Sequence, residues 1–286
     1  MTITTESGPR SFDPVELDIL WQSLIATVNE QARALQRAAF SPIVREAGDL
    51  ANAVFDRRGR MVAQAVTGTP GHINSLAIGA ANMLDEYPLD SIEPGDVLIT
   101  NDPYLTAGQL LDVTVLVPAW RRDRVIALFG STIHHTDVGG YGIGAGGRDC
   151  FEEGLWIPIC KLMTGGARNE DVWRFILSNV RQPDHMAGDL HAQLASGEVG
   201  AQRLDALCDT FGLEDIEALA DEIVERSEVA TRDSIRQLPA GTYHASAVLD
   251  LADGDRIDIV CAVTVDPDAG VITVDYDGTS GASPWG

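Results

Sequence analysis

The sequence is poor in basic residues and in long apolar runs. It has 20 Lys and Arg against 43 Asp and Glu, which gives a formal net charge of -23. This charge repels phosphate backbones and anionic lipid headgroups, so nucleic-acid and membrane partners are disfavoured. No apolar run approaches the roughly 18 residues that a bilayer-spanning helix needs, and the polar residues 1–10 show no secretory leader. We therefore expect a soluble chain.

Paired cysteines and the commonest enzyme signatures are also missing. The four cysteines form no C-x-x-C pair, which together with the lack of a leader favours a reduced, cytoplasmic setting. The patterns G-x-S-x-G, H-E-x-x-H and G-x-x-x-x-G-K-[ST] do not occur. The usual serine hydrolase and zincin motifs are thus excluded, and the chain is not expected to hold ATP in a Walker loop.

The residues that are present indicate a globular mixed fold. Hydrophobic residues make up 45% of the chain and charged residues 22%, enough for one large core or two modest ones. Asp13-Pro14 predicts the N-cap and first position of a helix. Apolar residues then recur every three or four positions, so this helix should run to about Ala39 and end before Ser41-Pro42.

Further elements follow from hydrophobic periodicity and turn residues. Residues 51–65 predict a β-hairpin with its turn at Gly59, and 76–87 predict a second helix. Three β-rich runs predict strands: 97–100, 113–117 and 125–134. Six glycines within 139–147 predict an irregular loop, because fixing so much backbone freedom inside an element is costly.

The order of these elements is not a strict βαβ repeat, so the predicted class is mixed α/β (α+β). Helical periodicity predicts three helices in the section 169–238, within an N-terminal core unit over 13–239. Alternation after Gly241 predicts the start of a β-rich unit, 240–286. About three strands are too few for an independent domain, so we expect further residues or a partner chain to complete it.

The densest group of chemically capable residues lies between 101 and 140. It contains Asn101-Asp102, Asp112, His134-His135 and Asp137, followed by Gly139-Gly140. Carboxylate oxygens together with imidazole nitrogens suit Zn, Mn or Fe(II). The alternative is structural: an Asx turn at Asn101-Asp102, a strand-start cap at Asp112 and an ordinary strand end at the histidines.

Strand geometry limits how the two histidines can act. Adjacent residues in a strand face opposite ways, so His134 and His135 cannot both point into one site without a bend. His135 could pair with Asp137, which would hold an imidazole tautomer, or His134 could face Asp112 across strands. The sequence leaves both arrangements open.

Other polar residues are weaker candidates. Glu46 and Asp49 follow a helix end and could be acid/base groups or ligands, with surface exposure the expected fate of at least one. His72, in a turn-rich stretch, could line a cleft or serve structure. His185 and Asp189 would share a helix face, more typical of a buried polar helix start than of a catalytic site.

One glycine pattern matches a nucleotide-binding fingerprint only in letters. Gly142-x-Gly144-x-x-Gly147 follows a His/Asp turn and has no convincing acidic partner about 20 residues further on. We interpret this segment as a mobile lid or an anion-binding nest rather than a dinucleotide site.

Many short motifs, in order and spacing over nearly the whole chain, resemble the N-terminal half of B-type subunits of the hydantoinase B/oxoprolinase family. Among them are Ser41-Pro42-Ile43-Val44-Arg45-Glu46, Phe55-Asp56-Arg57-Arg58-Gly59, Pro70-Gly71-His72-Ile73-Asn74-Ser75, Asn101-Asp102-Pro103-Tyr104, His134-His135-Thr136-Asp137 and Gly188-Asp189-Leu190. Family members are usually about twice as long, so the chain resembles a truncated or split B-type subunit.

The resemblance implies an A-type partner subunit that holds ATP with Mg and activates a carbonyl oxygen or amide for the B side. It also implies a metal site at Gln109, Asp112 and His134. Metal-containing relatives carry His at the position of Gln109, so this site departs from the pattern, because an amide oxygen is a weaker ligand for a transition metal.

The leading hypothesis is a subunit of an ATP-dependent cyclic amide hydrolase of hydantoinase or 5-oxoprolinase type, acting on a small molecule within a hetero-oligomer. The predicted catalytic residues are Glu46, Asp102, His135 and Asp137. The predicted cleft residues are His72, Asn101, Gly139 and Gly140. The alternatives are a subunit of an acetone- or acetophenone-type carboxylase and a non-catalytic structural subunit.

Overall fold

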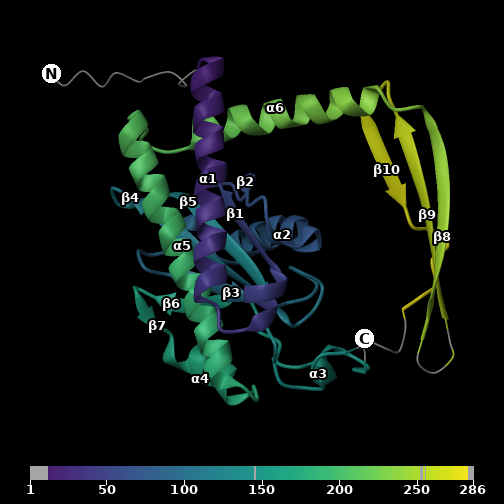
Figure 1. Cartoon of the computed structure of the whole chain (residues 1–286), viewed down its shortest axis with the longest axis horizontal. Coiled ribbons are helices and arrows are strands. Elements are labelled where there is room, and N and C mark those ends of the chain that lie inside the picture. The colour runs from purple at the N-terminus through teal and green to yellow at the C-terminus, as the bar shows by residue number, and fades with distance from the viewer. Residues whose placement is uncertain (1–11, 145, 252–253, 255, 283–286) are drawn as a thin grey trace. The chain divides into compact units, whose positions relative to one another are not determined.

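The computed structural model describes residues 12–144, 146–251, 254 and 256–282, and the polar stretch 1–10 lies outside them (Figure 1). The predicted mixed α/β class is confirmed, with a large sheet and long helices in the same chain. Contacts divide the chain into one compact unit up to Asp221 and a second from Glu222 onwards. The domain boundary predicted after residue 239 stays a prediction.

The first long helix forms as its sequence predicts. Helix α1 spans Pro14–Ala38, and the Asp13 side chain caps it by accepting from the amides of Val15 and Glu16. Its apolar stripe is buried against the sheet and α5. A short π-helical turn, η1 (Ile43–Ala47), follows and ends at Gly48, whose left-handed φ of 69° suits glycine.

A seven-stranded sheet forms the centre of the first unit. Its strands are β1 (Leu50–Phe55), β2 (Met61–Gln64), β3 (Val97–Thr100), β4 (Asp112–Arg121), β5 (Arg124–His134), β6 (Cys160–Thr164) and β7 (Ala167–Arg168). They lie in the order β2-β1-β5-β4-β3-β6-β7, and each pair is antiparallel. The hairpin at Gly59 and the three predicted strands are confirmed, while β6 and β7 were not predicted.

Helices cover both faces of this sheet. We call the face that packs against α2 (Pro70–Glu86) the front face. The opposite, rear face packs against α1 and α5 (Pro183–Phe211), which lie nearer the viewer in Figure 1. Two glycines of α5 allow its close approach, since a Cβ on Gly197 would lie 2.4 Å from Val117 and one on Gly200 2.4 Å from Phe129. The sheet is therefore buried on both sides.

The second helix corrects the sequence prediction. It begins at Pro70, six residues before the predicted start at residue 76, so His72 lies in its first turn and not in a turn-rich stretch. Pro70 is favourable at a first helical position because its missing amide would be unpaired there. The Pro and Gly at residues 70 and 71 resemble a turn in sequence, which is why the pattern misleads.

The remaining elements of the first unit are connections and helices. They are η2 (Leu89–Ser91), the four-residue α3 (Cys150–Glu153), α4 (Glu170–Ser178), α5 and α6 (Glu217–Arg236). The three helices predicted between 169 and 238 are thus confirmed. The glycine loop leads from β5 towards α3 beside an antiparallel sheet, so its context is not that of a dinucleotide-binding βαβ unit.

The second unit contains a three-stranded antiparallel sheet. Its strands are β8 (Gly241–Asp250), β9 (Arg256–Asp266) and β10 (Val271–Asp275), in the order β10-β9-β8. Its large apolar side chains include Tyr243, Leu249, Ile259, Ile272 and Val274, and all five are exposed. The three predicted strands are confirmed, and a sheet of this size with exposed apolar side chains is marginal by itself.

Within the described residues, no helix has the length and apolar character that crossing a bilayer requires.

Candidate functional site

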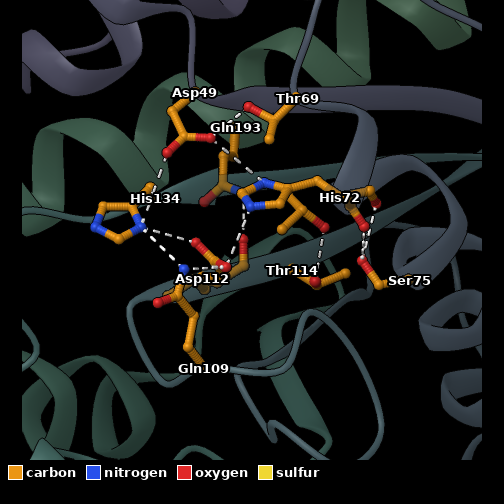
Figure 2. A network of polar contacts seen from close by, with 12 residues as sticks. Asp49, Thr69, His72, Ser75, Gln109, Asp112, Thr114, His134 and Gln193 are labelled. Carbon is orange, nitrogen blue, oxygen red and sulfur yellow. Dashed lines mark hydrogen bonds and ion pairs between the residues drawn. The ribbon is translucent and has the colours of Figure 1, made fainter. Parts of the chain in front are cut away.

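A polar cluster lies where β4 begins and β5 ends, on the α2 side of the sheet (Figure 2). We call it the front cluster, and its members are Asp49, His72, Gln109, Asp112 and His134. Asp112 and His134 are direct partners in the β4–β5 register, and His72 comes from the first turn of α2. Four separate chain segments therefore supply the cluster.

Asp112 is the buried centre of the front cluster. Its residue is 0% exposed, and its carboxylate lies 3.0 Å from Nδ1 of His134 and 3.2 Å from Nε2 of His72. Gln109 donates to it through Nε2 at 2.8 Å. Burial by itself would raise the pKa of Asp112, but the hydrogen bonds from His134 and His72 hold it well below its usual range. Asp112 is therefore an anion that organises both imidazoles.

Asp49 closes the other side of the front cluster. Its Oδ1 accepts from Thr69 Oγ1 at 2.5 Å and lies 3.8 Å from Nδ1 of His72, while its Oδ2 lies 3.9 Å from Nδ1 of His134. His72 therefore lies between two carboxylates. Burial lowers the pKa of His72, but the hydrogen bond and charge of Asp112 and the charge of Asp49 outweigh it and raise the pKa above the ordinary 6.5.

The contacts of His134 indicate which of its nitrogens carries the proton. Nδ1 is 3.0 Å from the Asp112 carboxylate and 3.4 Å from Nε2 of Gln109. The shorter contact to an anion favours Nδ1–H as the donor to Asp112, so Nε2 is the nitrogen that can accept a proton. Nε2 lies on the far side of the ring from Asp112 (Figure 2). This carboxylate–imidazole arrangement suits a general base.

The predicted metal ligands lie together, but their placement does not form a metal site. Gln109, Asp112 and His134 are in mutual contact, and the Gln109 amide is oriented with its nitrogen towards Asp112. Nitrogen of an amide is a donor of hydrogen bonds and not a metal ligand. No three His, Cys, Asp or Glu side chains in the described part of the chain are arranged to hold a metal ion. Zn, Mn or Fe binding stays a prediction.

His135 faces the opposite side of the sheet from His134. It is 1% exposed, and the residues near its ring are Asp189 and Gln193 of α5. Burial lowers the pKa of His135, with Asp189 and Gln193 opposing the shift. The strand rule that separates the two histidines is confirmed. His135 does not pair with Asp137, whereas His134 does face Asp112 across the strands.

Asp137 binds backbone amides instead. Its carboxylate accepts from the amides of Gly139, Arg181 and Gln182 and from the Arg181 guanidinium, which also donates to the carbonyls of Gly139 and Gly140. Burial raises the pKa of Asp137, but these donors outweigh it and lower the pKa. Asp137 and Arg181 thus fasten the glycine loop. Arg181 precedes α5 and is not on that helix.

Asn101 and Asp102 form a structural turn. The Asn101 side chain donates to the carbonyls of Leu110 and Leu155 and accepts from the amide of Ile157. Asp102 accepts from the amide of Tyr104, which is the Asx turn considered as the structural alternative. Both side chains use these groups to join loops.

Glu46 is exposed in the π-helical turn and makes no contact with the front cluster in the described structure. Its neighbour Asp49 lies in the cluster instead. Sequence reasoning weighed both carboxylates and selected Glu46. The deciding contact, between Asp49 and the Thr69–His72 turn, joins segments about 20 residues apart and leaves no local sequence pattern.

Comparisons with known proteins agree with this architecture. A family model described as hydantoinase B/oxoprolinase matches residues 13–286. The chain is 32% identical to the B-type subunit of a putative D-/L-hydantoinase of Pseudomonas sp. (strain NS671) over 282 residues, covering 95% of this chain and 48% of that one.

Two solved structures share the fold. A crystal structure of ATP-dependent caprolactamase from Pseudomonas jessenii aligns with a TM-score of 0.83 at 28% identity, over 93% of this chain and 46% of that one. A nucleotide-free acetone carboxylase structure aligns with a TM-score of 0.85 at 20% identity, over 96% and 38%. At that identity the second likeness shows the fold alone.

The chain spans about half the length of the curated relatives that it matches. The family match nevertheless covers all but the first twelve residues, and the motifs that carry it hold the front cluster in place. The chain therefore belongs to the hydantoinase B/oxoprolinase family.

Proposed function

We propose that this chain is the B-type subunit of an ATP-dependent hydrolase that opens a cyclic amide, and that His134 is its general base. The observation that carries the proposal is the contact between His134 Nδ1 and the buried Asp112 carboxylate at 3.0 Å. A carboxylate in this position holds the imidazole tautomer and stabilises the imidazolium that forms when the base takes a proton. His134 keeps 12% of its side chain exposed, so a substrate can approach it.

The proton balance of the proposed step is simple. In this proposal a partner subunit would use ATP to phosphorylate the amide oxygen, which makes the amide carbon electrophilic. Water then adds to that carbon and gives its proton to Nε2 of His134. The carbon–nitrogen bond breaks, and the same proton passes to the departing ring nitrogen. The acyl phosphate that results is hydrolysed to a carboxylate and inorganic phosphate.

Other members of the front cluster have supporting roles in this proposal. Asp112 orients His134, and Asp49 lies 3.9 Å from Nδ1 of His134, where it adds negative charge beside the imidazolium. His72 and Gln109 shield Asp112 from solvent and satisfy its oxygens. His135 is too buried to touch a substrate, so we assign proton transfer to His134 of the two.

Hydrolysis is favoured over carboxylation by the nature of the closer relatives. The putative hydantoinase subunit and the caprolactamase are named for cyclic amides and are 32% and 28% identical to this chain. The acetone carboxylase is more distant, at 20% identity. A carboxylase subunit is the second candidate, because it shares the fold.

Action within a hetero-oligomer belongs to the same proposal. The exposed apolar side chains of β8, β9 and β10 are typical of a surface that further polypeptide covers. The relatives that carry printed subunit names are B or beta subunits. We infer an A-type subunit, which would hold ATP and Mg, as the partner.

The test is a substrate panel on this chain copurified with an A-type subunit. Hydantoin, 5-oxoproline and caprolactam would be supplied with ATP, and acetone and acetophenone with ATP and bicarbonate. We expect a ring-opened amino acid and phosphate from at least one cyclic amide. Carboxylated ketone without ring opening would instead establish the carboxylase. Conversion that persists in His134→Ala would show that this chain is not the catalytic subunit.

A further inference from the structure

A second polar cluster lies on the rear face of the sheet, behind the front cluster. We call it the rear cluster, and its members are Ser41, His135, Asp189 and Gln193. Each of the four residues is at most 1% exposed. Asp189 and Gln193 are one turn apart on α5, so their side chains share the helix face that packs on the sheet.

Asp189 holds the chain segment that leads to Asp49. Its Oδ1 accepts from the amides of Phe40 at 2.6 Å and Ser41 at 3.1 Å. The segment continues through η1, where the Arg45 amide donates to the Ser41 carbonyl and the Asp49 amide donates to the carbonyl of Ile43. A short run of hydrogen bonds therefore connects Asp189 on the rear face with the backbone of Asp49.

Gln193 holds the strand pair that carries Asp112 and His134. Its Nε2 donates to the carbonyl of Val113 at 3.1 Å and to the carbonyl and hydroxyl of Ser131 at 3.2 Å. Val113 follows Asp112 directly, and its β5 partner Ile133 precedes His134. One side chain of α5 thus pins β4 and β5 next to both front-cluster residues.

Each member of the rear cluster also keeps one polar atom that has no hydrogen-bond partner among the described residues. These atoms are Ser41 Oγ, His135 Nε2, Asp189 Oδ2 and Gln193 Oε1. Buried polar atoms left unpaired are rare, because their desolvation is not compensated. A buried water usually makes about three hydrogen bonds to such atoms. Two acceptors, a hydroxyl and an imidazole nitrogen offer a water the partners it needs.

We propose that Asp189 and Gln193 are positioning residues for the front cluster, and that an internal water molecule joins them to Ser41 and His135. The proposal deepens the proposed function, on which it rests for the meaning of the front cluster. Asp189 and the water would set the place of Asp49, and Gln193 would set that of Asp112 and His134. The distances between Asp49 and the two imidazoles of the front cluster then depend on α5.

The first test is a crystal structure of the chain at high resolution. We expect an ordered water within hydrogen-bonding distance of at least two of the four unpaired atoms. A dry rear cluster, with those atoms paired directly to each other or repacked, would overturn the water bridge.

The second test compares Ser41→Ala with Ser196→Ala. Both serines are 0% exposed, but the Ser196 hydroxyl donates to the Gln193 carbonyl within α5. Ser41→Ala should displace the water and leave the chain folded, while Ser196→Ala should keep the water. Loss of the water from neither variant, or from both, would contradict the assignment of Ser41 as its partner.

The third test separates positioning from simple stability. Asp189→Leu should speed amide exchange at Phe40 and Ser41 by about tenfold, the factor expected for one lost hydrogen bond to a charged group. It should also change the imidazole ¹⁵N shifts of His72 and His134, while Asp189→Asn, which keeps an acceptor for both amides, should restore them. Lower stability with unchanged imidazole signals would make Asp189 merely structural.

These readouts stay decisive under other outcomes. If Asp189→Leu does not fold, the imidazole signals of Asp189→Asn and of the two serine variants are compared with those of the unaltered chain. Altered His72 or His134 signals in Ser41→Ala alone support the proposal, and unaltered signals in all three overturn it. None of the measurements uses turnover, so a failure of the proposed hydrolase does not change what they decide about the rear cluster.

Discussion

Asp112 and His134 face each other across β4 and β5, with the carboxylate 3.0 Å from Nδ1 of the imidazole. The next residue, His135, faces the opposite side of the same sheet and lies near Asp189 of α5. Two adjacent histidines thus have separate environments. One is partly exposed beside a buried anion, and the other is enclosed behind the sheet.

His134→Gln should abolish most of the proposed hydrolysis. Losing the general base is expected to lower kcat by about 10²- to 10⁴-fold, since glutamine cannot take up the proton from water. The measurement is ring opening by the copurified complex with ATP in excess. His244→Gln is the matched control, because His244 lies on β8 of the second unit. Equal losses in the two variants would point to a general histidine effect and not to this site.

Asp49→Asn should lower kcat more than Glu46→Gln does. Asp49 lies 3.9 Å from Nδ1 of His134, whereas Glu46 is exposed. Removing the Asp49 charge takes away stabilisation of the imidazolium, for which we expect about a tenfold loss if the interaction contributes about 1.4 kcal/mol. Steady-state kinetics on both variants decide the order. A larger loss in Glu46→Gln would restore the assignment made from the sequence.

Gln109→His should increase the affinity of the chain for Zn or Mn. The new imidazole would stand beside Asp112 and His134, and an imidazole nitrogen is a stronger transition-metal ligand than an amide oxygen. Elemental analysis after dialysis against each metal measures the change. The gain should disappear in the double variant that also carries Asp112→Ala. A gain that survives Asp112→Ala would place the metal elsewhere.

Asp137→Asn should destabilise the chain in a pH-dependent way. The lowered pKa of Asp137 means that its ionised form stabilises the fold, an effect present in full above the ordinary pKa of 3.8 and lost as the pH falls below it. At neutral pH we expect a loss of about 1–3 kcal/mol in the free energy of unfolding. Urea unfolding at pH 7 and pH 3 measures both values.

The control for this variant is Asp85→Asn, which changes a carboxylate of α2 that lies outside both clusters. The difference in unfolding free energy between the unaltered chain and Asp137→Asn should shrink at pH 3, while that for Asp85→Asn should be small at both pH values. A loss for Asp137→Asn that is independent of pH would show that its charge is unimportant.

Gly200→Ala should destabilise the packing of α5 on the sheet. A Cβ there would meet the buried Phe129 ring at 2.4 Å, and overpacking costs about 1–3 kcal/mol, more than the helix propensity of about 1 kcal/mol that alanine gains. Gly71→Ala is the matched control, because no atom lies within 4 Å of a Cβ in that first turn of α2. Thermal unfolding should show a lower Tm only for Gly200→Ala.

Local sequence determined much of the fold. Asp13-Pro14 begins α1 because a capping carboxylate and a proline satisfy a helix start without any tertiary contact. Alternation and turn residues located the hairpin at Gly59 and the strands that carry Asp112 and His134. The rule that strand neighbours face opposite ways separated His134 from His135 without any tertiary contact being considered.

The composition of the site was decided by tertiary structure. Asp49 joins His72, and Asp137 binds the amides next to Arg181, through contacts between segments that hydrophobic periodicity does not relate. Periodicity reports which face of an element is buried, but not which other element covers it. The sequence therefore identified the histidines and carboxylates of this protein. Only the packing of α2 and α5 against opposite faces of one antiparallel sheet chose which of them meet.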